Sequence, residues 1–272
     1  MSDCRIRKFT AMKEINKSKR NLVLAEFLRI INSFFGCLSG YMTYLEAVKC
    51  IDVPQYKIIF KFDDLVNCNK KVLKLDKLVK YYDLKVCWGI IGNSLENVNR
   101  DYIEFIKNNS GGNYYHFFNH GYYHLQGPEY EFFNKPEEEQ EVLIRKTQDI
   151  VRDNTGVVLD SFGAPCNHVD DNTRIALESI TEIKYWFYGK ENYNSFNIKR
   201  LIDMEISVGK PNFKFFINRL RSLKDDTGVL TLQGHPYMWG LEQWFNFKLI
   251  VLFLKRVGCK FIFPNEVGEI ND

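Results

Sequence analysis

Two of the chain's five histidines, His120 and His124, lie four residues apart after a strand-like run, and this spacing suits metal chemistry. If the segment forms a helical turn, both imidazoles project from one face and reach a single ion. The alternative is structural: such pairs arise often by chance, and the rings would then cap a helix or hydrogen-bond to nearby carbonyl groups. The pair therefore defines a metal-site hypothesis that needs a further ligand.

Acidic residues that could complete the site follow another strand-like run, where Asp63 and Asp64 are adjacent. Two histidines and one carboxylate suit Zn²⁺ and leave room for a water, while the second carboxylate is free to act as a base. Bound Zn²⁺ brings the pKa of water close to neutrality. His235 could protonate a leaving group, and backbone N–H groups around Pro165 and Cys166 could hold an oxyanion. These are the parts of metal-assisted amide or ester hydrolysis.

The elements that must position these residues alternate along the chain. Residue patterns predict strands at 56–62, 85–91, 114–118, 157–162, 183–188, 229–232 and 261–263. Helices are predicted at 69–82, 102–108, 136–154, 172–180, 213–223 and 244–257. This alternation favours an α/β fold with parallel strands and crossover helices. The candidate residues all follow strand ends, and active sites of α/β barrels lie on that rim.

The N-terminal region is predicted to be a helical extension, residues 1–50, packed on a catalytic barrel of residues 51–272. After a basic, partly flexible start, apolar residues recur at the spacing of an amphipathic helix: Leu24, Phe27, Leu28, Ile31 and Phe35. A short second helical segment is expected at 44–50. Glu26 and Arg29 argue against a secretory signal, and no stretch has the ~20 consecutive apolar residues of a membrane span.

The composition is that of an ordinary soluble globular protein, with 45% hydrophobic and 26% charged residues. A net charge of +3 without a dense basic face gives no indication of a nucleic-acid partner. The seven cysteines are scattered and include no C-x-x-C pair, which favours reduced thiols in a cytoplasmic compartment. We therefore expect a soluble, cytoplasmic protein; the sequence does not define its oligomeric state.

Four segments in order carry a family resemblance: FKFDD at 60–64, HGYYH at 120–124, FGAPCN at 162–167 and LQGHP at 232–236. From residue 56 onward, the chain resembles the polysaccharide deacetylases of carbohydrate esterase family 4, the NodB-homology type. The resemblance implies a distorted (β/α) barrel of about seven parallel strands. It also implies a reaction that removes N- or O-linked acetyl groups from sugars and depends on Zn²⁺ or another divalent transition metal.

Carried onto this sequence, the resemblance makes Asp63 the catalytic base, His235 the general acid and the Cys166 N–H part of an oxyanion hole. It makes three residues metal ligands: Asp64, His120 and His124. Aromatic residues near these motifs are candidate sugar-stacking platforms, or equally core residues: Tyr122, Tyr123, Tyr237 and Trp239. Asn167 is a further candidate for substrate binding.

The chain also departs from the family pattern. Gly163 stands where the family has an arginine that orients the base, and Cys166 replaces an aromatic residue. The acid that partners the catalytic histidine has no clean match, and two residues are candidates: Asp203 and Glu205. These departures leave the three metal ligands intact. They remove the residues that in the family orient the base and partner the acid, here Asp63 and His235. Asn167 and His168 are possible substitutes, and His168 has the simpler reading of a helix-start residue.

The expected function is therefore that of a cytoplasmic, metal-dependent deacetylase. Its substrate would be an acetylated sugar or glycan precursor, such as an intermediate of surface-polysaccharide biosynthesis. One rival is a non-catalytic barrel that binds glycans, which the glycine at position 163 suggests. Another is a metal amidohydrolase that acts on a non-sugar amide. Acetate release from acetylated sugars and from simple amides would separate the three.

Overall fold

The structure is a computed structural model that describes residues 2–50, 54–97, 100–125, 127–190, 196–224 and 228–267, with α1 side chains described from residue 25 except Phe27. The strands are β1 (Lys57–Leu65), β2 (Val86–Ile90), β3 (Tyr115–Asn119), β4 (Ser161–Phe162), β5 (Tyr185–Phe187), β6 (Phe196–Ile198), β7 (Val229–Gly234) and β8 (Lys260–Phe261). The helices are α1 (Ser2–Cys50), α2 (Lys70–Tyr82), α3 (Arg100–Asn109), α4 (Glu137–Thr155), α5 (Asp171–Glu178), α6 (Phe213–Ser222) and α7 (Leu241–Arg256).

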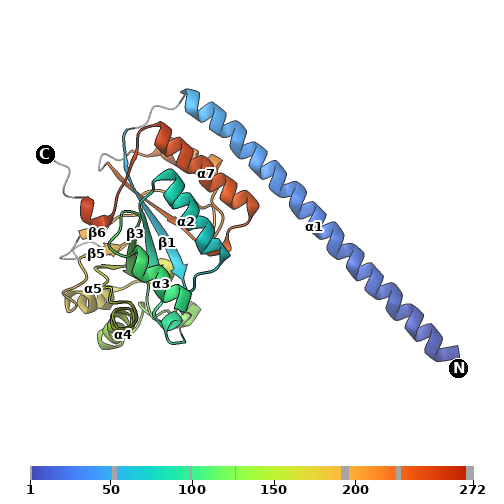
Figure 1. The fold of residues 1–272 in the computed structure, drawn as a ribbon, viewed down its shortest axis with the longest axis horizontal. Coiled ribbons are helices and arrows are strands. Elements are labelled where there is room, and N and C mark those ends of the chain that lie inside the picture. Colours follow the sequence, from blue (N-terminus) through green and yellow to red (C-terminus); the bar gives the residue numbers. More distant parts are fainter. Residues whose placement is uncertain are drawn as a thin grey trace.

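Within the described residues, the strands form one parallel sheet in the order β6-β5-β4-β3-β2-β1-β7, with β8 beside the start of β1. The sheet curls into a half-barrel that helices surround (Figure 1), so the predicted α/β distorted barrel is confirmed. The strand β6 was not predicted. Its three residues, FNI, are too few to show a periodicity that separates a strand from a loop.

The central strands have one face toward the helices and one toward the half-barrel interior, because successive side chains of a strand point to opposite faces. In β1, Phe60 and Phe62 belong to the cluster packed with α7, where Phe60 and Phe247 rings lie 5.5 Å apart. Ile59 belongs to a second cluster with Cys87 and Phe118. Lys61 and Asp63 alternate with the outer residues and are buried on the inner side. The interior is thus apolar low in the barrel and charged at the rim.

Helix α1 is continuous and leaves the body along most of its length (Figure 1), instead of forming the two helical segments expected. Its C-terminal part contacts α7 and α6, where Ala47 is buried. The predicted packing of Leu28 and Phe35 on the body is wrong, because these side chains are 49% and 60% exposed. At the level of Phe35 it is the neighbouring Gly36 that faces α7, against Glu242. Leu24 and Phe27 lie outside the described side chains. Among the described helices, none combines the length and apolar character needed to cross a membrane.

Candidate active site

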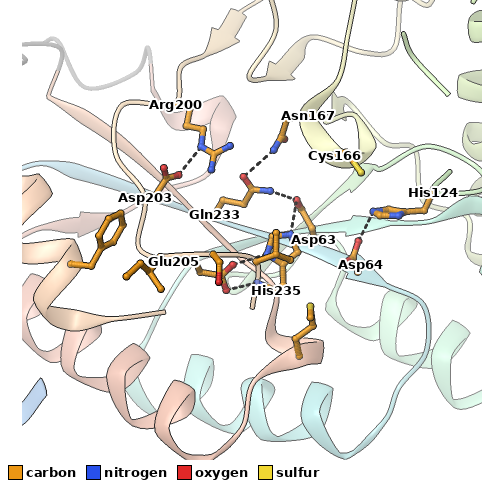
Figure 2. Close-up of a pocket in the computed structure, with 15 residues that line it drawn as sticks. Asp63, Asp64, His124, Cys166, Asn167, Arg200, Asp203, Glu205, Gln233 and His235 are labelled. Atoms are coloured by element: carbon orange, nitrogen blue, oxygen red, sulfur yellow. Dashed lines mark hydrogen bonds and ion pairs between the residues drawn. The ribbon is translucent and has the colours of Figure 1, made fainter. Parts of the chain in front are cut away.

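The predicted site residues converge because parallel strands end at one rim. Asp63 and Asp64 lie near the C-terminal end of β1, which pairs with β2 and β7. His120 directly follows β3, and His235 directly follows β7. Figure 2 shows the two aspartates, His124 and His235 around one pocket.

The two adjacent aspartates both reach the site because the strand is irregular there. In a regular strand, neighbouring side chains point to opposite faces. Asp64 instead has a φ of 63°, in the left-handed region that aspartate tolerates better than most residues. The register between β1 and β2 shifts between Phe62 and Leu65. This bulge turns the Asp64 carboxylate to the same side as that of Asp63.

The His120–His124 segment is a loop, so the predicted helical turn is wrong. Gly121 and His124 have φ angles of 74° and 59°, which no α-helix accommodates. The Glu131 carboxylate holds the loop by accepting hydrogen bonds from the N–H groups of Tyr122, Tyr123 and His124 at 2.9, 2.8 and 2.7 Å. Sequence reasoning missed Glu131, because nothing in its spacing marks a carboxylate that binds backbone.

Three side chains present ligand atoms that lie within 4.8 Å of one another: Asp64, His120 and His124. Asp64 Oδ1 is 3.0 Å from His124 Nε2 and 3.5 Å from His120 Nε2. His120 Nδ1 lies 2.6 Å from the Gly163 carbonyl oxygen, so it carries the proton that it donates there. His120 Nε2 then bears a lone pair and, among the described residues, has no hydrogen-bond partner.

This donor set fits a divalent cation. A buried nitrogen lone pair that faces a carboxylate oxygen is unfavourable unless a cation lies between them. A ligating histidine that donates its other N–H to a carbonyl is the usual arrangement around zinc. Two nitrogen ligands and one carboxylate leave open positions, as in catalytic sites.

The Asp63 carboxylate is the most firmly held group at the rim. Lys61 Nζ donates to both of its oxygens at 2.6 and 2.8 Å, and Gln233 Nε2 donates to Oδ2 at 2.5 Å. Burial raises the pKa of Asp63, but the neighbouring cationic groups, Lys61 first, outweigh it, and the net shift is downward. Asp63 is therefore ionised and oriented, with Oδ2 3.7 Å from His235 Nε2.

His235 has the acid partner for which the sequence left two candidates. Glu205 Oε2 lies 2.7 Å from His235 Nδ1, and its Oε1 accepts from the His235 backbone N–H. Asp203 pairs instead with Arg200 Nε at 2.6 Å. Burial disfavours the imidazolium, but the Glu205 hydrogen bond and the nearby carboxylate charges, Asp63 among them, together outweigh it and raise the pKa of His235. His235 Nε2 can thus carry a proton on the side that faces Asp63.

The turn at Pro165–Asn167 brings Cys166 and Asn167 to the cavity, with left-handed φ angles of 56° and 55°. Asn167 Nδ2 donates to Gln233 Oε1 at 3.2 Å (Figure 2), which links this turn to the amide that holds Asp63. His168 lies apart from these residues, stacked on the Tyr130 ring at 4.1 Å. It does not substitute for the missing arginine.

Two of the four aromatic candidates cannot stack on a sugar. Trp239 is 1% exposed, packs against the Phe62 and Phe247 rings and donates from Nε1 to Glu205. Tyr122 is equally buried, and its hydroxyl group donates to Glu96. They were core residues that sequence pattern could not distinguish from a platform. Tyr123 and Tyr237 are 45% and 49% exposed and remain accessible at the surface.

The cavity at the rim has a volume of about 660 Å³, within the range of small-ligand sites. Its lining combines the charged and titratable side chains of Asp63, Asp64 and His235 with four apolar residues: Ile206, Val208, Phe215 and Met238. A ligand in this cavity would therefore meet both charged and apolar surface.

No protein-family model matches the chain, and no curated protein matches it either. Solved structures do. Peptidoglycan deacetylase PdaC from Bacillus subtilis is 17% identical, with 80% of this chain and 93% of that chain covered and a TM-score of 0.54. A family 4 acetyl xylan esterase from Clostridium thermocellum in complex with a cobalt ion is 14% identical, with 79% of this chain and 91% of that chain covered and a TM-score of 0.56. A CE4 family pseudoenzyme from Bacillus anthracis is 14% identical, with 79% of this chain and 66% of that chain covered and a TM-score of 0.55.

These likenesses concern the fold, since each is below a fifth in sequence identity. They include a peptidoglycan deacetylase and a pseudoenzyme whose mutant has restored enzymatic activity, so the fold by itself does not decide whether catalysis occurs. The half-barrel described above is the polysaccharide deacetylase fold of carbohydrate esterase family 4.

Proposed function

We propose that the protein is a metal-dependent hydrolase that removes an N- or O-linked acetyl group from a sugar or glycan precursor. The observation that carries the proposal is the arrangement of Asp64, His120 and His124, in which the His120 Nε2 lone pair faces a carboxylate oxygen. Zn²⁺ is the ion that this nitrogen-rich set favours, and other divalent transition metals would fit the same ligands.

The residues around the ligands then have distinct tasks. A divalent cation at this position would acidify a water and polarise the acetyl carbonyl group. Asp63, held by Lys61 and Gln233, accepts the proton of the attacking water. His235 Nε2 donates a proton to the departing sugar nitrogen or oxygen, and Glu205 stabilises its protonated form. The two groups face each other across 3.7 Å, so one accepts and the other releases a proton in the same small space.

The substrate class is supported by the solved structures that share the fold, which include a peptidoglycan deacetylase and an acetyl xylan esterase. We extend the proposal to a cytoplasmic precursor of a surface glycan. Its support is the scattered set of seven cysteines without a C-x-x-C pair, which favours a reducing compartment.

The first test is metal content and acetate release by the purified protein, assayed on acetylated sugars and sugar nucleotides with and without Zn²⁺. We expect about one divalent ion per chain and metal-dependent release of acetate. His120→Ala should lose the ion, whereas His168→Ala, a histidine outside the ligand set, should retain it. A protein that holds no stoichiometric ion, with His120→Ala unchanged in metal content and stability, would contradict the metal site.

A second test separates chemistry from binding. Asp63→Asn removes the base and leaves Asp64, His120 and His124 in place, so we expect normal metal content and acetate release reduced by about 10²–10⁴-fold. Full activity in this variant would remove Asp63 from its role.

The alternative is a glycan-binding barrel without activity, and the pseudoenzyme with the same fold favours it. Glycan binding without acetate release from any substrate under metal-replete conditions would support this alternative. Release of acetate from simple amides in preference to sugars would instead support an amidohydrolase.

A further inference from the structure

The buried lysine beneath the rim has no assigned role in the family pattern. Lys61 lies two residues before Asp63 on β1 and is fully buried, whereas lysine is almost never buried without a partner. Three aromatic rings surround its ammonium group, with centroids 5.2–5.9 Å from Nζ: Phe118, Phe187 and Tyr188. Burying an ammonium group is costly unless it is paired, so the partner of Lys61 is the next question.

The ammonium group contacts both oxygens of the Asp63 carboxylate, at 2.6 and 2.8 Å. Two contacts from below fix both the position and the rotation of the carboxylate, and Gln233 adds a third from β7. Held in this way, the Asp63 carboxylate lines the cavity, with Oδ2 3.9 Å from His120 Nε2 and 3.7 Å from His235 Nε2.

Position 163 provides the complementary observation. A Cβ atom on Gly163 would lie 3.1 Å from Lys61 Cε, 3.0 Å from Phe118 Cε2 and 3.3 Å from Phe187 Cβ. The lysine stem therefore passes beside the position that a side chain at 163 would occupy. A large side chain at position 163 would crowd the stem of Lys61, and one of the two would have to shift.

We infer that Lys61 is the positioning residue of the Asp63 base and occupies the place of the arginine that Gly163 lacks. The inference rests on the proposed function, because it assigns Asp63 its orientation as a base. The cation reaches the carboxylate from the base's own strand instead of from the strand end near Pro165. Glycine at 163 then leaves room for the lysine stem.

The activity test exchanges the two positions. Lys61→Ala should lower kcat for acetate release at least 100-fold, with metal content retained and KM changed less than about threefold. Gly163→Arg should also lose activity, because its side chain meets Lys61 and Phe118. The double variant Lys61→Ala/Gly163→Arg restores one cation in a vacated space and should recover at least tenfold over Lys61→Ala. Lys57→Met is the matched control, a lysine on the same strand and face that should leave kcat unchanged.

A second measurement does not need activity. Lys61→Met leaves the buried Asp63 carboxylate without its cation and should lower Tm by on the order of 10 °C. In an Asp63→Asn background the same change removes a cation that has lost its partner, so Tm should stay level or rise. This coupling, measured as a double-mutant cycle, reports the ion pair even if the wild-type protein releases no acetate.

The outcomes distinguish the two proposals. A wild-type protein without acetate release but with a strong Lys61–Asp63 coupling contradicts the proposed function and retains the ion pair. An active wild-type protein in which Lys61→Ala keeps its kcat, or in which the double variant is no better than Lys61→Ala, overturns the positioning role. Additive Tm changes in the cycle overturn the ion pair itself.

Discussion

The two histidines on either side of Asp63 differ in what their second ring nitrogen contacts. His120 Nδ1 is bonded to the Gly163 carbonyl, an uncharged acceptor, which directs Nε2 to the metal-ligand cluster. His235 Nδ1 is bonded to the Glu205 carboxylate, which favours the imidazolium form. A neutral imidazole can bind a metal and a protonated one can act as an acid, so the partner of Nδ1 separates the two roles.

This difference predicts a pH effect. The raised pKa of His235 keeps its proton in place to higher pH, so the basic limb of the kcat/KM profile should lie above pH ~6.5, the ordinary histidine pKa. Glu205→Gln removes the stabilising charge, so the pKa of His235 should fall and the basic limb should move to lower pH.

The control for this profile is Asp203→Asn, which removes a carboxylate from the same cavity but one that pairs with Arg200. It should leave the position of the basic limb unchanged, whatever its effect on rate. An unshifted limb in Glu205→Gln would mean that His235 is not the group that limits activity at high pH.

At the scale of elements, the metal site depends on a loop that has no regular structure. The Glu131 side chain accepts hydrogen bonds from three backbone N–H groups of the His120–His124 loop. These bonds take the place of the backbone hydrogen bonds that a helix would form. Its side chain is buried, although it does not contact the proposed ion. The position of the His124 imidazole is therefore set by a carboxylate seven residues further along the chain.

We expect Glu131→Ala to weaken metal affinity by about 10–100-fold, because the loop loses the anchor that orients one ligand. Competition with a chromophoric chelator would measure the affinity. Hydrogen exchange would show faster exchange of the Tyr122, Tyr123 and His124 amides. Glu129→Ala, an exposed glutamate from the same loop region, is the control and should change neither quantity. Equal affinity in Glu131→Ala would show that the ligand set orders itself.

At the scale of the whole molecule, the half-barrel interior is closed below by apolar side chains and carries its charges at one rim. Helix α1 joins this body through its last turns, where Gly40 faces α7 closely enough that a Cβ atom would lie 2.9 Å from Asn246 Oδ1. Asn246 is buried, and the same oxygen accepts from the Phe213 N–H at the start of α6. One amide thus connects three helices.

Gly40→Leu should force α1 away from α7 and lower the free energy of unfolding by about 1–3 kcal/mol, the usual cost of overpacking a close contact. Urea unfolding followed by circular dichroism would measure it. Ser39→Leu, at an exposed position of the same helix, is the control and should change stability by less than about 0.5 kcal/mol. Equal stability of both variants would mean that the α1–α7 contact does not contribute.

The sequence by itself determined the alternation of strands and helices and the residues that meet at the rim. Both follow from local rules: hydrophobic period defines the elements, and parallel strands place their carboxyl ends together. Asp63, Asp64, His120 and His235 could be assigned to one site for that reason, before any distance was known.

Only the tertiary structure decided two kinds of feature: contacts between residues far apart in sequence, and local irregularities of the backbone. The His120–His124 loop is not helical, because Gly121 and His124 adopt left-handed angles that depend on Glu131. Whether Trp239 forms a platform or core depends on which rings pack around it. The support of the base depends on the curl of the sheet, which brings Gly163 beside the stem of Lys61. The hydrophobic periodicity of the sequence contains no information about these contacts, because they form only when separate strands pack around a shared interior.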